Sequence, residues 1–438
     1  MSIGSPGSGA HPPPAAGETP DARVPDMPPL RGRVTPRRAP SGGSLGAMRW
    51  IDHWVGLPLC FLLGVLVTMR RRLLPRPELP IRERGTIVVL KFFGLGSIIE
   101  ATPLLRAIRR RHPGVRLVFL TFASNRALLE RLSLCDEVRA IRTRPPLGFV
   151  IDTLRELMWL RSRDVDAIVD LEFFSKFSTL MAVMGGGRRR VGYHLNDFWR
   201  FSLLTHPIYF NYYRHITDLY AHAGRQLDVT VESQELSAVP VDDGARSRVA
   251  RSLEEQGWTS GERVIGINVN AGDLSLERRW PPEHFARLIE ELLRRHQDLR
   301  VILTGSPDES EYVRGIWNRL DASARPKALV TAGRWTLDEF LASLERMTCF
   351  VTNDSGPMHL AAAQGTPMVS LWGPGRPEFY APRVPNHEVI YQRFPCSPCL
   401  YMFTTFEGMW CNHEAPCMQV IAPAQVLAAV ERRLGGRG

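Results

Sequence analysis

The stretch TNDSGPMHLAAAQGTPMVSLWGP, residues 352–374, decides the fold of this chain. It predicts a strand that ends at Asn353, a helix that begins near Pro357, and a second strand that follows a sharp turn at Gly365. Ser355 is a typical N-cap, and a proline just after it is typical of a first helical turn. The stretch is therefore one strand–helix–strand unit, and such units indicate a parallel α/β sheet.

The same alternation runs through most of the chain on either side. Strands are expected at 86–91, 115–121, 166–171, 263–269, 300–305, 328–331, 349–353 and 368–372, and helices at 98–111, 125–133, 150–162, 283–296, 308–320, 337–346 and 357–364. Periodicity is poor between 195 and 240, so we expect two doubly wound α/β domains, over 81–240 and 241–422. Ligands of such folds bind beyond the carboxyl ends of the strands, which makes the cleft between the domains the expected site. A last segment, 423–438, is expected to form a helix that packs back on the N-terminal domain.

Composition places the chain among ordinary globular proteins. It has 438 residues, 44% of them hydrophobic, which excludes a wholly disordered protein, a collagen and a small disulfide scaffold. The formal net charge is +10, and only three of the 55 basic residues are lysines. Such a charge favours anionic partners such as phosphates, a membrane surface or an acidic glycan. Nothing more specific indicates nucleic acid.

The N-terminal 80 residues differ from the rest. Residues 1–47 hold ten prolines and eight glycines and are expected to be disordered, and Met48 is an alternative start. Residues 54–69 are apolar and uncharged, and three arginines follow them where a signal peptide would need small residues. Sixteen helical residues span about 24 Å, less than a bilayer core. We therefore expect 48–80 to form a membrane-associating segment with a basic linker, and a buried helix is the alternative.

Two glycine-containing turns have the character of anion sites. GLGSIIEATPLLRAIRRRHPG, residues 94–114, follows an expected strand and opens a helix, although it lacks the full G-x-G-x-x-G pattern. In the later motif the amides of Ser355 and Gly356 lie at a helix N-terminus, where a diphosphate is favoured. His359 is on the first turn of the same helix.

Together with ERRWPPEHFARL, residues 277–288, these stretches resemble glycosyltransferase family 9, the family of bacterial lipopolysaccharide heptosyltransferases. The resemblance covers roughly 85–435. It implies a GT-B fold of two Rossmann-like domains, with the acceptor on the N-terminal domain and the nucleotide sugar on the C-terminal one. It also implies metal-independent transfer with inversion at the anomeric carbon, without a cofactor.

The resemblance assigns the donor side, and the charged residues of the acceptor side are predicted from a strand end over 170–178 and from a basic run over 188–190. The residues expected to bind the donor are Asn270, Ala271, Arg278, Asp308, Glu309, Asp354, Ser355, Gly356 and His359. Arg278 stands where the heptosyltransferases have lysine, and either Asp308 or Glu309 would meet the nucleoside ribose. The residues expected on the acceptor side are Gly96, Glu172, Lys176 and Arg190.

The catalytic base is the main departure from the family pattern. Ser97 stands where the best-known members have an aspartate, and serine cannot accept a proton at neutral pH. Glu100 lies one turn further on the same expected helix face, which makes it the first candidate base. Asp170 and Glu172 are the alternative carboxylates, and substrate-assisted or lost activity is the remaining alternative.

Four of the seven cysteines lie near the C-terminus, at Cys396, Cys399, Cys411 and Cys417. Their spacing allows a structural zinc site, packed free thiols or disulfides. The resemblance supplies no metal role for them.

The sequence therefore predicts an inverting glycosyltransferase that moves a sugar, with ADP-heptose as the donor that the resemblance suggests, onto a lipid-linked or lipopolysaccharide-type glycan. We expect it at the cytoplasmic face of the bacterial inner membrane, as a peripheral or monotopic protein. The alternative is a catalytically inactive nucleotide-sugar-binding scaffold in a membrane glycan-assembly complex.

Overall fold

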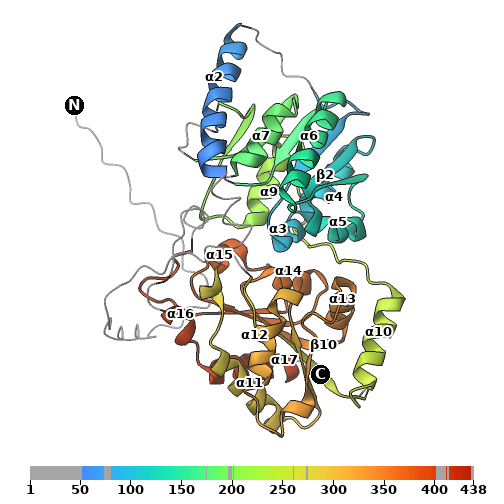
Figure 1. The fold of residues 1–438 in the computed structure, drawn as a ribbon, viewed down its shortest axis with the longest axis vertical. Helices are drawn as coiled ribbons and strands as arrows, with labels where there is room; N and C mark the ends of the chain where they lie inside the picture. The colour runs from blue at the N-terminus through green and yellow to red at the C-terminus, as the bar shows by residue number, and fades with distance from the viewer. Residues whose placement is uncertain are drawn as a thin grey trace, which may run out of the picture.

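A computed structural model of the chain describes residues 52–73, 80–173, 175–195, 200, 202–259, 261–272, 275–400, 411 and 414–435. The expected leader over 1–47 and Met48 lie outside these residues. Two α/β domains follow one another along the chain, one above the other in Figure 1.

The N-terminal domain is built on a parallel six-stranded sheet of order β3-β2-β1-β4-β5-β6. Its strands are β1 (Thr86–Leu90), β2 (Arg116–Phe122), β3 (Glu137–Ile141), β4 (Ala167–Asp170), β5 (Arg189–His194) and β6 (His206–Tyr209). Its helices are α2 (Leu57–Leu73), α3 (Leu95–Glu100), α4 (Thr102–Arg111), α5 (Arg126–Leu132), α6 (Pro146–Ser162), α7 (Lys176–Met184) and α9 (Ile216–Arg225). Alternate residues of β1 face two apolar layers, one with α3, α4, α5 and α9 and the other with α6 and α7.

The C-terminal domain repeats this plan in a second parallel sheet of order β12-β11-β10-β7-β8-β9. Its strands are β7 (Arg263–Asn268), β8 (Leu299–Thr304), β9 (Ala328–Val330), β10 (Met347–Asn353), β11 (Met368–Trp372) and β12 (His387–Tyr391). Its helices are α10 (Asp243–Glu254), α11 (Pro282–Arg295), α12 (Ser310–Trp317), α13 (Leu337–Arg346), α14 (Gly356–Ala363), α15 (Pro377–Tyr380), α16 (Pro416–Gln419) and α17 (Pro423–Gly435). When the six strands of either domain are numbered along the chain, their spatial order is the Rossmann order 3-2-1-4-5-6.

Burial explains why these segments form a parallel sheet. Every residue of β10 and of β11 is buried, as expected for strands that helices cover on both faces. Helices α11, α12 and α17 share one apolar cluster with β7 and β8, whereas α13 and α14 belong to the cluster on the other face.

The two domains meet at α3 and α14, each of which follows a central strand of its own sheet. Ile98 and Ile99 of α3 belong to the same buried cluster as Met358 and Leu360 of α14. The carboxyl ends of β1 and β10 therefore face each other across this contact (Figure 1).

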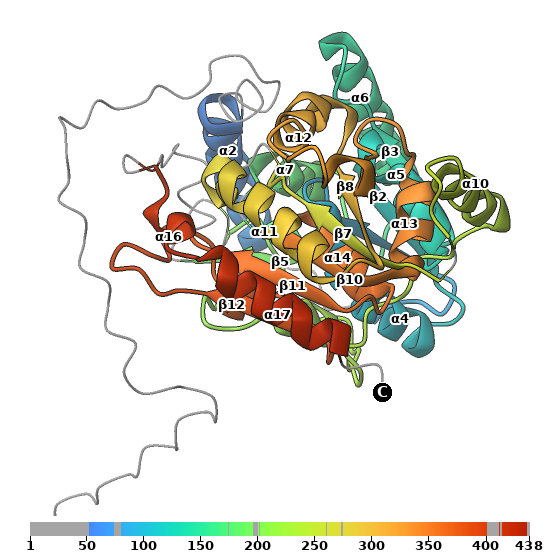
Figure 2. The same ribbon diagram turned by 90° about the horizontal axis from the view of Figure 1, so that it is seen from below.

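The predicted α/β fold of two doubly wound domains is confirmed, with differences in detail. The helix expected over 98–111 is two helices, which break at Ala101. Four strands were not expected, namely β3, β5, β6 and β12. The expectation that the last helix packs on the N-terminal domain is wrong, because α17 packs on α11, β10 and β11 (Figure 2). Its apolar side chains complete the core of the C-terminal domain.

The predicted apolar segment is helical. A π-helical turn over Asp52–Gly56 leads into α2, and the helix over Trp54–Leu73 is long and apolar enough to cross a membrane by length and composition. It packs on α7, where Cys60 is buried beside Leu203. Only 17% of its most apolar window is buried, so the alternative of a buried core helix does not agree with the structure.

Candidate active site

The first turn of α14 has the character of an anion site. Asn268 Nδ2 donates to Ser355 Oγ at 2.8 Å, and Thr352 Oγ1 lies 3.1 Å from the same oxygen. Because the Ser355 side chain is bound to the strands, it does not cap the backbone amides of its own helix. Those amides and the positive end of the helix dipole favour an anionic group.

Arg278 joins the two loops that border this turn. It is only 7% exposed, and its guanidinium donates to the carbonyl oxygen of Asp354 at 2.7 Å and to the carbonyl oxygen of Ala271. Its Nη1 also lies 3.6 Å from Asp354 Oδ2. The structure thus brings together three predicted donor residues that are far apart in the sequence, and it places a buried positive charge beside the helix N-terminus.

Asn270 is the least satisfied residue of the site. It is 1% exposed, and neither its Nδ2 nor its Oδ1 has a hydrogen-bond partner among the described residues. A buried amide without partners costs about 1–3 kcal/mol. Gly305 leaves room for it, since a Cβ at Gly305 would lie 3.1 Å from Nδ2 of Asn270. The amide is therefore positioned to pair with a ligand at the carboxyl edge of the sheet.

The structure distinguishes the two acidic candidates after β8. Glu309 accepts a hydrogen bond from the Ser306 backbone at 2.8 Å, which caps the turn. Asp308 is exposed. Asp308 is therefore the better placed of the two to meet a ribose.

Glu100 and His359 meet across the domain interface. Nδ1 of His359 lies 2.7 Å from Oε1 of Glu100, and the side chains are 6% and 1% exposed. A carboxylate can only accept, so Nδ1 is the donor of this hydrogen bond, and in the neutral form of the imidazole Nε2 is the acceptor. Gly96 permits this approach, because a Cβ there would lie 2.2 Å from Cδ2 and 2.8 Å from Nε2 of His359.

Sequence reasoning missed Tyr380 and Gly375. Tyr380, on α15, shares a hydrogen bond with Ser97, and burial raises its pKa far above the usual value. A Cβ at Gly375 would lie 2.6 Å from Asp354 Oδ2, so this glycine lets the loop after β11 approach the site. The glycines of WGPG, residues 372–375, were the available signal.

The charged residues predicted on the acceptor side have protein partners. Glu172 accepts from Lys91 Nζ at 2.8 Å and from the Phe92 and Phe93 amides. Lys176 pairs with Asp52 at 3.8 Å, and Arg190 donates to two backbone carbonyls. Their acceptor role stays a prediction.

Asp170, one of the alternative bases, is completely buried and bound to Arg200 and Ser178. Burial is the main cause that raises its pKa above the usual range. The other alternative, Glu172, is held by the contacts above. Neither group reaches the Glu100–His359 contact in this arrangement.

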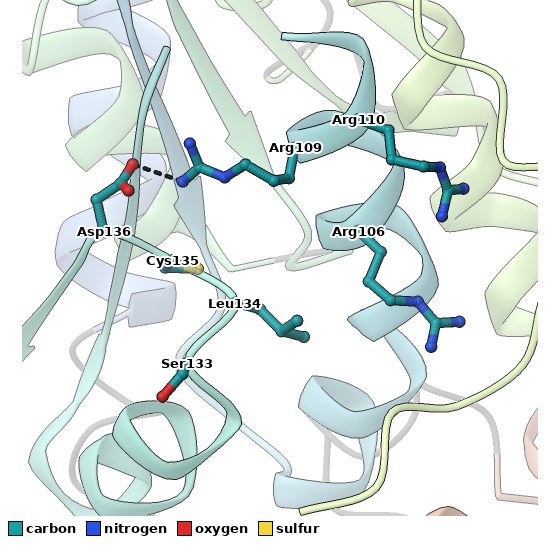
Figure 3. Close-up of a pocket in the computed structure, with 7 residues that line it drawn as sticks. All are labelled: Arg106, Arg109, Arg110, Ser133, Leu134, Cys135 and Asp136. Carbon is teal, nitrogen blue, oxygen red and sulfur yellow. Dashed lines mark hydrogen bonds and ion pairs between the residues drawn. The ribbon is translucent and has the colours of Figure 1, made fainter. Parts of the chain in front are cut away.

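A shallow cavity of about 320 Å³ lies beside α4, away from these residues, and includes three of its arginines (Figure 3). Arg109 reaches across it to Asp136 at 2.5 Å. Arg106 and Arg110 point away from Asp136 in Figure 3. With its one inward arginine already paired, this cavity is a poor anion site.

The four C-terminal cysteines are free thiols. Burial raises the pKa of Cys417 to about 12 and that of Cys399 to about 11, and the neighbouring thiols contribute. Within the part of the chain that the structure describes, no group of three or more His, Cys, Asp or Glu side chains could hold a metal ion. Residues 401–410 and 412–413, between these cysteines, lie outside it.

Comparison with known proteins identifies one family. The profile of glycosyltransferase family 9 (heptosyltransferase) matches residues 158–409. Lipooligosaccharide heptosyltransferase 2 of Haemophilus influenzae is 33% identical over 143 residues, which are 32% of this chain and 40% of that protein. Lipopolysaccharide heptosyltransferase 2 of Escherichia coli is 35% identical over 113 residues, 26% of this chain and 32% of that protein. The matched part therefore spans less than half the length of these relatives.

Solved structures agree on the fold. A family 9 glycosyltransferase from Veillonella parvula superposes with a TM-score of 0.66 at 23% identity, over 81% of this chain and 99% of that one. ADP-heptose lipopolysaccharide heptosyltransferase II of Escherichia coli gives a TM-score of 0.63 at 22% identity, over 80% and 98%. The predicted GT-B arrangement is confirmed by both.

Proposed function

The chain belongs to glycosyltransferase family 9, and from that premise we propose that it transfers a sugar from a nucleotide-sugar donor to a glycan acceptor, with inversion and without a metal. The observation that carries the proposal is the meeting of the two sequence motifs at one place. The glycine loop of α3 and the first turn of α14 contact each other through Glu100 and His359. A site of this kind can hold donor and acceptor on opposite sides of one reacting bond.

The donor half of the proposal rests on complementary charge. A nucleoside diphosphate would lie at the first turn of α14, where helix amides and Arg278 face it. These groups stabilise the negative charge that grows on the diphosphate as the bond to the sugar breaks. The unpartnered Asn270 amide and the exposed Asp308 supply contacts for the rest of the donor.

Glu100 would act on the acceptor proton through His359. As the acceptor oxygen bonds to the anomeric carbon, its proton passes to Nε2 of His359, and the bonding electrons of the donor leave with the diphosphate. Glu100 holds the imidazole in the required tautomer and stabilises it once it is protonated. The pair then supplies the base that Ser97 cannot.

Membrane attachment through α2 supports a lipid-linked acceptor, here a lipopolysaccharide-type glycan at the cytoplasmic face of the inner membrane. The helix exposes large apolar side chains and ends in three consecutive arginines. Apolar area and basic charge are the two features that hold a peripheral protein on anionic lipid. A chain that begins at Pro80 should stay in solution after ultracentrifugation, whereas the full chain should sediment with membranes.

The deciding experiment tests a panel of nucleotide sugars that includes ADP-heptose. Binding of each is measured by thermal shift, and transfer of its sugar to a lipid-linked glycan is then assayed. A bound donor raises the unfolding temperature, because it binds only the folded state. Asp354→Asn should reduce that shift, with exposed Asp243→Asn as the matched control. Binding without transfer would favour the inactive scaffold, and no stabilisation by any member of the panel would overturn the proposal.

A further inference from the structure

Helix α6 presents its apolar residues to the outside of the molecule. Leu147, Val150, Ile151, Leu154 and Met158 are between 50% and 69% exposed. Their spacing of three or four positions places them on one face of the helix. This stripe is long enough to run over most of the helix from Pro146 to Ser162.

The inward face of the same helix carries charge. Asp152 and Glu156 are each 1% exposed. Asp152 accepts two hydrogen bonds from the Arg142 guanidinium, at 2.7 and 3.0 Å, and Glu156 is bound to Arg139. In a water-exposed helix the apolar stripe faces the core and the charges face outward. Helix α6 buries Leu160 in the apolar layer with α7, yet it also has apolar residues on its outward face. Burying paired charges gives no gain in stability that would by itself explain this arrangement.

Helix α6 lies on the same face of the sheet as α7, on which α2 packs. Figures 1 and 2 both place α7 between α2 and α6, and α7 contacts each of them. Arg161 of α6 donates to the carbonyl oxygen of Met184 at the end of α7, and Met184 is itself 38% exposed. The exposed apolar residues of α2 are Trp54, Val55, Leu59, Phe61, Leu62, Val65, Leu66, Met69 and Leu73.

Charge at the helix ends favours lipid over a protein partner. Arg70, Arg71 and Arg72 close α2, and the exposed Arg161 and Arg163 stand at the corresponding end of α6. An apolar strip bordered by arginines matches the acyl chains and anionic headgroups of a bilayer. Among the described residues, the helix that contains α2 is the one segment long and apolar enough to cross a membrane.

We propose that α6 is a second membrane-binding element, and that the side of the N-terminal domain formed by α2, α7 and α6 lies flat on an anionic bilayer. The proposal rests on the membrane attachment proposed above for α2. Both helices begin at the carboxyl edge of the sheet, since Asp52 is bound to the Phe177 amide at the start of α7 and α6 follows β3. A lipid-linked acceptor could then reach the domain interface while its acyl chains stay in the bilayer.

The test is flotation of the full chain with vesicles of phosphatidylethanolamine and phosphatidylglycerol. Changing Leu147, Ile151, Leu154 and Met158 together to glutamine should reduce the bound fraction about tenfold or more. The matched control keeps the stripe apolar, as Leu147→Met, Ile151→Leu, Leu154→Met and Met158→Leu, and should bind as the wild type does. Circular dichroism and the thermal midpoint verify that both variants are folded.

A second variant separates this inference from the attachment by α2. Changing Leu59, Leu62 and Leu66 to glutamine should also weaken binding. If only the α2 variant loses binding, the inference about α6 is wrong while the attachment by α2 stands. If neither does, both are wrong. Light scattering tests the last outcome. If the wild type is a dimer, the α6 glutamine variant is a monomer and vesicle binding is unchanged, then the stripe is a contact between two copies and the inference about lipid is wrong.

Discussion

Nδ1 of His359 lies 2.7 Å from Oε1 of Glu100, although the two residues are 259 positions apart in the sequence and belong to different domains. Each side chain is almost completely buried. The hydrogen bond therefore links the positions of the two domains to the orientation of the imidazole. Any movement that separates the domains also releases the imidazole from its carboxylate.

Glu100→Gln tests the proposed proton relay. The amide oxygen of glutamine can still accept from Nδ1 of His359, so packing should survive while the negative charge is lost. We expect turnover to fall by a factor of roughly 100 to 10,000 with little change in donor affinity. Ser97→Asp in the same background should restore part of the activity. Turnover within a few-fold of wild type would exclude the relay.

Gly96→Ala tests the closeness of the two domains. The added methyl would lie 2.2 Å from Cδ2 of His359, so either the imidazole or the whole α3–α14 contact must shift. We expect a loss of about 1–3 kcal/mol in the free energy of unfolding, together with reduced activity. Gly261→Ala is the matched control, because a Cβ there meets nothing within 4 Å. Equal denaturation midpoints for the two variants would contradict the prediction.

Asn270→Ala tests whether its unpartnered amide serves the donor. Because the buried amide makes no hydrogen bond in the described protein and costs about 1–3 kcal/mol, its removal should leave the unfolding free energy unchanged or raise it. Donor affinity measured by calorimetry should fall about 5- to 150-fold, as expected for a lost contact of 1–3 kcal/mol. Asn353→Ala provides the contrast, because Asn353 bonds the Val269 carbonyl and the Trp280 amide and should be needed for stability. An Asn270→Ala protein that binds the donor normally would remove this residue from the site.

Protonation of the His215 imidazole should make the protein less stable in acid. Its Nδ1 accepts from the Thr217 amide at the start of α9, and its Nε2 lies 3.0 Å from the Ala381 carbonyl of the other domain. Burial lowers the pKa of this imidazole below its unfolded value near 6.5. The unfolded chain therefore binds more protons, so this stabilisation is present above about pH 6.5 and is lost as the pH falls.

The measurement is the thermal midpoint between pH 7.5 and 5.5. His215→Asn keeps a helix-capping side chain without a titrating group, and its midpoint should fall less than that of the wild type. Exposed His222→Asn, on the same helix, is the control and should follow the wild type. Identical slopes for all three proteins would contradict the role of His215.

Much of the fold could be predicted because the sequence pattern is local. The strand, N-cap and turn of 352–374 form one unit that depends only on neighbouring residues, and β7 to β11 follow the same rule. Strand β3 was not expected, because it is only partly buried and carries alternating charges, as in Glu137 and Arg139. The domain on which α17 packs depends on which core its apolar face completes. The periodicity of the sequence does not contain this information.

The sequence predicted candidate members of the site but could not predict the contacts between them. Asp354, Arg278 and Ala271 come from separate motifs, and the structure brings them within hydrogen-bond distance. The partner of Glu100 could not be found from the sequence, because it depends on how one domain sits on the other. For the same reason the outward stripe of α6 looks in sequence like an ordinary core-facing helix.

The packing of α3 on α14 also affects the rate at which the donor binds. The first residue of α14, Gly356, lies against Leu95, since a Cβ there would be 3.7 Å from the Cβ of Leu95. This contact narrows the approach to the turn, where Gly356 is only partly exposed, and we expect the two domains to move apart as a diphosphate enters. The observed rate constant for donor association should therefore level off at high donor concentration, at the rate of that opening. At saturating donor, the rate of binding would then depend on the protein and not on the donor concentration.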